Sequence, residues 1–265
     1  ATIDYRYTGK NPNNYVCFGS EETPCPSENL YRIIGVIPTQ STEDGPYENR
    51  VKLIKNNYYT ETKSGYLESH SNAPNGKGYK WNKGINSNDW TLSALNLNVL
   101  NQVYWNALEE NKKFIEPTKW YLGAPHYGNF NLYKSEDFYK SERSNSQGYS
   151  QGPISVVANI GLMYPSDYGY SIDEKEKTIY ENREKYRNEA WLYNLTSSTS
   201  EWTITAEREF KDSYGTLAGV LQGEGNVYRT YVNNIFGVRP TFYLKADVLY
   251  SKGDGSIENP YRICL

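Results

Sequence analysis

The chain has 265 residues, a net charge of −3 and 37% hydrophobic residues. This length is enough for one large domain or two small ones with a substantial core. Its 28 basic residues form no Lys- or Arg-rich run, so the sequence lacks the electrostatic pattern that nucleic-acid binding requires.

Aromatic residues supply much of the apolar content, with 27 tyrosines, 7 phenylalanines and 6 tryptophans against 1 methionine. A tyrosine buries its ring while its hydroxyl stays solvated, so this composition favours loop-rich β structure over a helical bundle. No apolar run reaches the length of a membrane span, and the sequence begins at Ala1. We therefore expect a trimmed or mature soluble ectodomain.

The first 56 residues contain four short runs in which apolar and polar side chains alternate. These runs predict strands joined by turn-rich loops, and the last two predict a hairpin. The runs cover residues 3–7, 14–18, 30–37 and 50–56. Residues 57–88 are rich in Gly, Asn and Ser, which predicts a long surface excursion.

Cys17 and Cys25 flank a short loop of Gly, Pro and Ser residues, whereas Cys264 is the penultimate residue. The eight-residue spacing across a strand-to-loop turn suits a disulfide bond of the kind that secreted chains keep. The alternative is a pair of reduced thiols in a cytosolic protein.

Residues 88–111 predict an amphipathic helix, because apolar side chains recur there every three to five residues. Asp89 or Thr91 would cap its N-terminus. The apolar positions are Leu92, Leu95, Val99, Val103 and Leu108.

The middle of the chain mixes short elements. Residues 119–124 predict a strand and residues 135–144 a short helix. Residues 154–164 carry many β-branched side chains and predict the most deeply buried strand. Residues 165–171 predict a turn, and the charged run 173–191 predicts a solvated helix.

Short strands and glycine turns dominate the remainder of the chain. The predicted strands cover residues 201–206, 215–222, 225–232, 237–250 and 259–265. No repeat of solenoid length and no linker is visible, so we expect a single α+β domain.

Residues suited to catalysis or metal binding are sparse. His70 and His126 are the only histidines, and neither has a nearby Cys or a second His at metal-ligand spacing. Asp254, Ser256 and Glu258 alternate like the start of a calcium loop, but a hairpin turn built on the adjacent glycines explains them more simply. We therefore expect no cofactor, with calcium as an open alternative.

Several short motifs follow one another in a fixed order: NPNNYVCF, LYRIIGVI, VKLIKN, NDW, GLMYPSDYGY, WLYN, EWTI, GVRP and GDGSIENPYRI. WLYN, EWTI and GVRP resemble the C-terminal half of C-type-lectin-like domains of the formylglycine-generating-enzyme subtype. The full set resembles a large group of bacterial cell-surface proteins that carry a pilin-type N-terminal anchor. The resemblance extends from about residue 11 to residue 263.

The resemblance implies a C-type-lectin-like α+β fold with irregular antiparallel sheets, one or two main helices and long loops. One domain would span residues 1–265, with N-terminal strands in 1–56, a helix and loops in 57–150, and a C-terminal sheet in 151–265. The structural signature would be Trp202, Gly237, Arg239 and Pro240, with Trp202 and the strand after Gly237 in the central sheet. Arg239 would be a paired structural arginine, because a lone buried cation needs hydrogen-bonded partners, although a ligand contact is the alternative.

Some domains of this subtype are variable proteins of diversity-generating retroelements, in which the segment corresponding to residues 210–236 changes the ligand. Tyrosine and asparagine, which adaptable binding surfaces favour, are frequent in that window. The resulting candidate ligand-binding residues are Tyr214, Gln222, Asn226, Tyr228, Tyr231, Asn233 and Asn234.

The resemblance implies a non-enzymatic, surface-displayed adhesin or receptor module. It would be extracellular and attached to the membrane only through an N-terminal anchor outside this sequence, and its partner would be a protein or glycan on another cell or surface. A structural pilus or cell-wall subunit is the alternative. A degenerate enzyme is disfavoured, because formylglycine generation uses two late redox-active cysteines and only Cys264 is late here.

Overall fold

The computed structural model describes residues 4–125, 130–144, 152–212 and 215–263. It shows an α+β protein with few helices, as the sequence predicts, and its sheets are mixed and antiparallel. No described helix is long and apolar enough to cross a membrane. One cluster of buried side chains includes Leu53, Val99 and Trp202, and so joins the N-terminal, middle and C-terminal segments.

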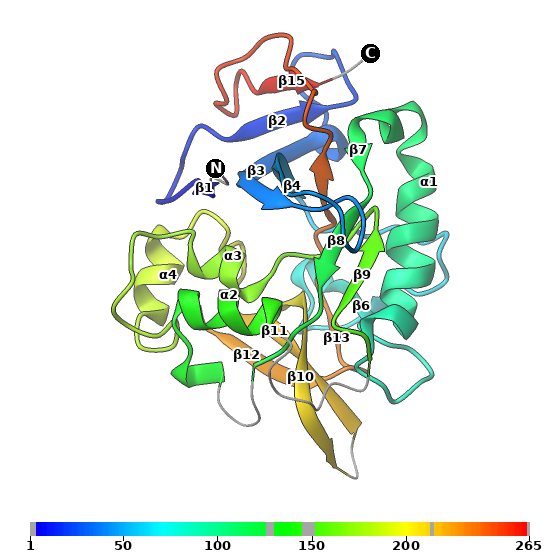
Figure 1. Cartoon of the computed structure of the whole chain (residues 1–265), viewed down its shortest axis with the longest axis vertical. Coiled ribbons are helices and arrows are strands. Elements are labelled where there is room, and N and C mark those ends of the chain that lie inside the picture. The colour runs from blue at the N-terminus through cyan, green and yellow to red at the C-terminus, as the bar shows by residue number, and fades with distance from the viewer. Residues whose placement is uncertain (1–3, 126–129, 145–151, 213–214, 264–265) are drawn as a thin grey trace.

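A seven-stranded sheet occupies one end of the molecule (Figure 1). Its order is β15-β2-β3-β4-β14-β7, with β1 paired to β3. The β15–β2 pair is parallel, so the expectation of antiparallel sheets alone is wrong at this edge. The strands are β1 (Tyr5–Arg6), β2 (Tyr15–Phe18), β3 (Leu30–Thr39), β4 (Glu48–Lys55), β7 (Ile115–Glu116), β14 (Thr241–Leu244) and β15 (Tyr261–Ile263).

The predicted N-terminal strands and the β3–β4 hairpin are confirmed. β1 can pair with β3 because residue 35 is glycine, since a Cβ atom there would clash with the carbonyl oxygen of Tyr5. The segment predicted as a surface excursion is only partly so. It forms β5 (Glu68–Ser69), η2 (Pro74–Gly76) and β6 (Lys77–Lys80), and its Trp81 is fully buried.

Three smaller sheets complete the β structure. The sheet β10-β11-β12 lies at the opposite end from the seven-stranded sheet (Figure 1), β13 pairs with β6, and β8 pairs with β9. The strands are β8 (Thr118–Tyr121), β9 (Ser155–Ala158), β10 (Ser200–Asp212), β11 (Gly215–Gln222), β12 (Val227–Tyr231) and β13 (Ile235–Phe236). Trp202 therefore belongs to β10 in a separate sheet, which corrects its predicted place in the central one.

The main helix begins later than predicted. Asp89 caps the short helix η3 (Trp90–Leu92) by accepting a hydrogen bond from the backbone of Thr91, but the chain is extended at Ser93. The continuous helix follows as η4 (Leu95–Tyr104) and α1 (Trp105–Ala107) and leads into η5 (Glu109–Phe114). Leu92 precedes this break and is exposed, so its predicted place on the apolar face of the main helix is wrong.

The remaining helices are short. They are η1 (Ser27–Asn29), η6 (Phe130–Leu132), α2 (Ser135–Arg143), α3 (Pro165–Gly169) and α4 (Arg183–Glu189). α2 packs against α3 and lies with α4 on the side of the molecule away from α1 (Figure 1), and it confirms the helix predicted at 135–144. The charged run after residue 173 is helical only in α4.

Residues 154–171 differ most from their prediction. Only Ser155–Ala158 form a strand, which is partly exposed, whereas residues 160–169 are buried without being a strand. Asp167 accepts a hydrogen bond from the backbone of Tyr164, and Pro165 is the first residue of α3, where proline is favoured. The chain therefore turns into α3 at Tyr164 and does not continue as a strand. The predicted strand 237–250 is likewise limited to β14, because residues 245–247, which directly follow Leu244, are exposed.

Candidate functional site

The predicted ligand window lies on the β10-β11-β12 sheet and its connections. Tyr214 lies outside the described residues. Tyr228 pairs with Val220, and Tyr231 pairs with Leu217, three residues along the same strand. Because side chains alternate across a strand, Tyr228 and Tyr231 project from opposite faces of β12 and do not form one surface.

The other window residues are also separated. Asn226 is buried, and its amide lies 3.3 Å from the Gln222 side-chain oxygen at the β11–β12 turn, which contradicts a surface role for it. Asn233 is exposed, while Asn234 donates to Thr230 Oγ1. The described part of the window therefore does not gather the candidate residues into one site.

The calcium alternative finds little support in the local geometry. Asp254 Oδ1 accepts a hydrogen bond from the backbone of Ser256, and Gly253 and Gly255 have positive φ angles. These features describe a turn. Among the described residues, no group of three or more His, Cys, Asp or Glu side chains could hold a metal.

A more coherent site lies where β3 begins and β4 ends. Three hollows adjoin there, and Asn57 lines all of them. We call them the Tyr59 pocket, the Asn194 pocket and the Arg32 pocket, and together the Asn57 site. Tyr31 and Arg32 are consecutive on β3 and therefore face opposite sides of the sheet, so the site extends around the end of this hairpin.

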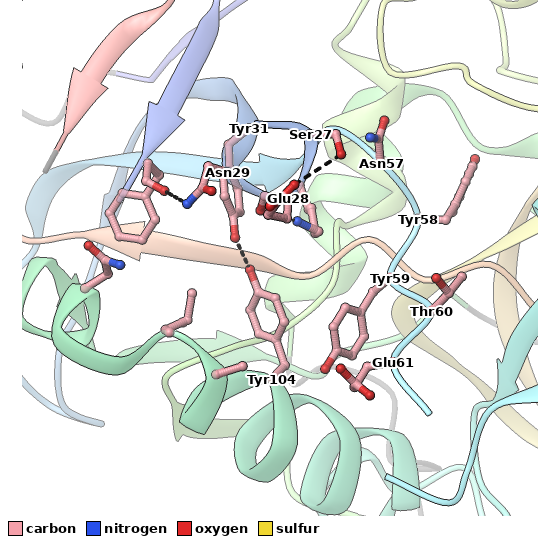
Figure 2. Close-up of a pocket in the computed structure, with 15 residues that line it drawn as sticks. Ser27, Glu28, Asn29, Tyr31, Asn57, Tyr58, Tyr59, Thr60, Glu61 and Tyr104 are labelled. Carbon is pink, nitrogen blue, oxygen red and sulfur yellow. Dashed lines mark hydrogen bonds between the residues drawn. The ribbon is translucent and has the colours of Figure 1, made fainter. Parts of the chain in front are cut away.

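The Tyr59 pocket has a volume of about 510 Å³ and is rich in tyrosine. Figure 2 shows Tyr31 of β3 meeting Tyr104 of η4, with 2.6 Å between the hydroxyl oxygens. Burial raises the pKa of Tyr31 to about 12, so this pair stays neutral at physiological pH. The hydroxyl of Tyr59 is buried and has no hydrogen-bond partner among the residues that the structure describes, so one polar group of the lining is left unsatisfied.

A buried lysine completes this pocket. Lys55 Nζ donates to the carbonyl oxygen of Glu28 at 2.6 Å and lies 5.1 Å from the centre of the Tyr31 ring. Burial lowers the pKa of Lys55 to about 8. The pocket thus offers aromatic rings, hydroxyl groups and one cation, together with the side chains of Glu28 and Glu61.

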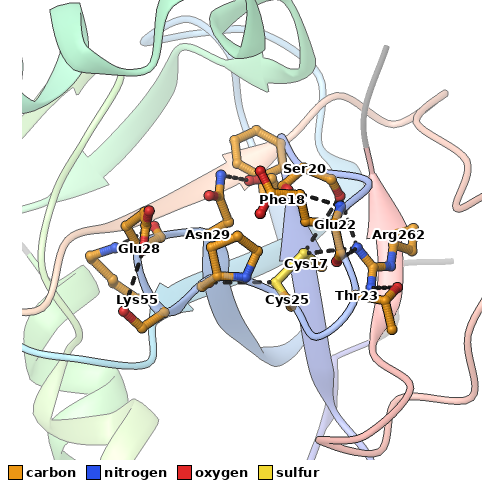
Figure 3. The surroundings of a disulfide bond; sticks show 12 residues. Cys17, Phe18, Ser20, Glu22, Thr23, Cys25, Glu28, Asn29, Lys55 and Arg262 are labelled. Atoms are coloured by element: carbon orange, nitrogen blue, oxygen red, sulfur yellow. Dashed lines mark hydrogen bonds between the residues drawn. A yellow bond between two sulfur atoms is a disulfide. The ribbon is translucent and has the colours of Figure 1, made fainter.

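The Cys17–Cys25 disulfide bond predicted from the sequence is present and supports the wall of this pocket. The loop that it closes leads directly into η1, whose three residues line the pocket. Figure 3 shows Arg262 of β15 beside the bond, donating to the carbonyl oxygens of Ser20 and Glu22. The bond therefore fixes a loop that is also held from the C-terminal strand.

Reduction of this bond is expected to lower the free energy of unfolding by about 2–3 kcal/mol, because the closed loop is short. Urea unfolding with and without a reductant measures the change, and a Cys17→Ser/Cys25→Ser variant should reproduce it without responding to the reductant. Titration of three free thiols in the unfolded, unreduced protein would contradict the bond.

The Asn194 pocket has a volume of about 740 Å³ and connects the other two. It shares Tyr58 with the Tyr59 pocket, and Tyr193 and Asn194 with the Arg32 pocket. Its remaining lining is mostly small and polar, with Ser71, Asn75, Thr196 and Thr199 among it. This pocket can therefore make hydrogen bonds to a ligand along its length, and it offers little apolar surface.

The Arg32 pocket has a volume of about 420 Å³ and an unusual charge. Four cations and no carboxylate line it, although the whole chain is acidic. Five asparagines add amide groups. The charged members are Lys10, Arg32, Arg187 and Arg239, and the asparagines are Asn11, Asn56, Asn57, Asn188 and Asn194.

Arg239 is neutralised as the sequence predicts. Its Nε lies 2.7 Å from Glu201 Oε1, and a terminal nitrogen lies 2.9 Å from Oε2, with both side chains buried. Gly237 allows the Tyr58 ring to pack close to the backbone, because a Cβ atom there would meet the ring at 2.8 Å, and the Tyr58 hydroxyl donates to Glu201 Oε2 at 3.2 Å. Pro240 directly precedes β14, which is an interior strand of the sheet, so the predicted edge or bulge position is wrong. The carbonyl oxygen of Pro240 accepts a hydrogen bond from the backbone of Lys55.

Most residues of this site were not predicted from the sequence. Arg32 interrupts the apolar run LYRIIGVI in the same way that Arg239 interrupts its own run, and that signal could have identified it. Asn57 and Asn194 have no such signal, because asparagine is common throughout the chain. Comparison of the chain with family models, curated proteins and solved structures finds no match.

Proposed function

We propose that this chain is a non-enzymatic, surface-displayed ligand-binding module of a bacterial adhesin or receptor, with a C-type-lectin-like fold. The proposal places the ligand in the Asn57 site instead of the predicted window. Its ligand would be a glycan on another cell or surface.

The observation that carries this proposal is the continuity of the three hollows around Asn57. A row of adjoining hollows fits an elongated ligand better than a compact one. Tyrosine rings and asparagine amides supply the apolar faces and paired donors and acceptors that sugar rings require. A glycan chain is elongated, and its sugar rings present apolar faces and hydroxyl groups along its whole length.

The alternative is a structural pilus or cell-wall subunit whose head only packs against neighbouring copies. The exposed Tyr228 on β12 and the exposed Leu249 and Tyr250 after β14 are apolar groups that such packing could use. They lie on separate segments, which favours the ligand-binding proposal.

Replacing Asn57 and Asn194 together by alanine is expected to weaken glycan binding about tenfold or more, because the change removes two amide groups from the shared lining. Both residues are exposed, so the fold should remain. Binding is measured on an array of neutral and acidic oligosaccharides and then by calorimetry with the strongest binder.

Tyr228→Ala is the matched variant in the predicted window, and it should bind as the unchanged protein does. Loss of binding in Tyr228→Ala with retention in the double variant would move the ligand to the window. Absence of any glycan binding, combined with self-association of the chain in solution, would favour the structural subunit.

A further inference from the structure

We infer that the Arg32 pocket is an acid-recognising subsite that binds the carboxylate of an acidic sugar. This inference deepens the proposed function by assigning the chemical class of one part of the ligand. It is drawn from the unpaired charge, the aromatic packing and the hydrogen bonding of Arg32.

Arg32 is buried without a counter-ion. Its exposed fraction is 7%, and no carboxylate of the described residues lies within salt-bridge distance. Burial, together with the nearby Arg239 guanidinium, lowers the pKa of Arg32 to about 10, so the side chain is still charged at neutral pH. A buried cation of this kind is stabilised when an anion binds beside it.

Two aromatic rings and one amide hold the guanidinium in place. Its central carbon lies 4.1 Å from the centre of the Tyr15 ring and 4.6 Å from that of the Trp191 ring. Tyr15 is the cross-strand neighbour of Arg32, and the indole nitrogen of Trp191 donates to Tyr7, so both rings are fixed by the fold. The side chain therefore needs no reordering when a ligand arrives.

The hydrogen bonds of Arg32 use only some of its guanidinium N–H donors. Nε donates to Asn14 Oδ1 at 2.8 Å, and one terminal nitrogen reaches the carbonyl oxygen of Pro12 at 3.4 Å. The other terminal nitrogen has no partner among the residues that the structure describes. Arg262 differs, because its terminal nitrogens are bound by Ser20, Glu22 and Thr23 and it lines none of the three hollows.

The free edge of a planar guanidinium matches the two oxygens of a carboxylate. Exposed Lys10 and Arg187 at the same pocket add positive charge that attracts an anion, and neither has a salt-bridge partner in the described part of the chain. The five asparagines can bind sugar hydroxyls around the acid. A volume of about 420 Å³ accommodates one sugar residue of the glycan.

Calorimetry with matched pairs of probes tests this inference. The pairs for calorimetry are trigalacturonate with its methyl ester and sialyllactose with lactose. A third pair, free glucuronate and glucose, is compared by the changes that each causes in the amide and indole NMR signals of Trp191. At least one acidic member is expected to bind about tenfold more tightly than its neutral partner. Equal binding within every pair would overturn the subsite while leaving the proposed function intact.

The two proposals can fail separately. A response of Trp191 to glucuronate but not to glucose, with no oligosaccharide binding, would support the subsite and contradict the glycan groove. If no probe bound in any assay, both the proposed function and the acidic subsite would be overturned. Inorganic sulfate or phosphate that displaces the acidic probe at equal concentration would contradict selection for a carboxylate.

Arg32→Lys retains the charge but not the planar edge, and it should remove most of the preference for the acidic member of each pair. Arg32 is packed between aromatic rings, so its replacement could disturb the fold. A second variant at exposed positions therefore tests the same pocket without this risk. Lys10→Glu/Arg187→Glu reverses two exposed charges of the pocket and should weaken binding of the acidic probe more than binding of its neutral partner. Lys83→Glu, an exposed cation outside the three hollows, is the control and should alter neither.

Discussion

Arg239→Ala is expected to lower the free energy of unfolding by about 3–5 kcal/mol, because it leaves the buried Glu201 carboxyl without its cation. Arg239 makes two hydrogen bonds to Glu201 and a third, of 2.7 Å, to the carbonyl oxygen of Leu192. Burial raises the pKa of Glu201, and Arg239 opposes this effect. Without the arginine, we expect the carboxyl to take up a proton. Denaturant unfolding followed by tryptophan fluorescence measures the loss.

Replacing both partners distinguishes an ion pair from a simple packing defect. Arg239→Met/Glu201→Leu removes both charges while keeping side-chain volume, and it should recover most of the loss. Lys252→Ala removes one partner of an exposed pair and should leave the stability unchanged. If Arg239→Ala alone cost less than about 1 kcal/mol, the structural role of this arginine would be wrong.

Asp167→Asn is expected to have an effect of similar size, about 3–5 kcal/mol at neutral pH, because this carboxylate balances two buried cations. Its oxygens lie 2.7 Å from a terminal nitrogen of Arg6 and 2.6 Å from Lys52 Nζ. Lys52 is fully buried among aromatic rings, and Tyr164 is the nearest, with its centre 4.4 Å from Nζ. These contacts join β1 and β4 of the main sheet to α3.

The same carboxylate predicts a pH dependence. Burial raises its pKa, but Lys52, Arg6 and the hydrogen bonds more than offset this, and the net pKa falls from 3.8 to about 2. A depressed carboxyl pKa gives stability that is present above the unfolded value and is lost as the pH falls through the folded value. The contribution of Asp167, about 2 kcal/mol from this shift, should therefore disappear between about pH 4 and pH 2.

Urea unfolding of the unchanged protein and of Asp167→Asn from pH 7 to pH 2 measures this contribution. The difference between the two proteins should be constant above about pH 5 and should narrow below pH 4. Glu136→Gln, in an exposed pair with Lys140, provides a carboxyl control whose difference stays small throughout. A constant difference down to pH 2 would show that Asp167 acts through packing and not through its charge.

The sequence predicted the elements whose signal is local. Alternation along β3 and β4, the cap at Asp89 and the spacing of Cys17 and Cys25 each involve residues close together in the chain. The break at Ser93 and the helix α3 escaped prediction, because a periodic apolar pattern does not show where the backbone bends. The buried Tyr79 and Trp81 in a polar segment likewise depended on what packs over them.

The candidate site depended on tertiary structure throughout. The sequence by itself determined that Arg239 needs a partner, since burying a lone cation is costly anywhere in a protein. Only the fold decided that Glu201 would satisfy it, and that Arg32 would lie between Tyr15 and Trp191 with no carboxylate of the described residues beside it. Periodicity reports on neighbours within a strand or helix, whereas a pocket forms where packing brings distant segments together. Arg32 and Trp191 meet although they lie 159 positions apart in the sequence.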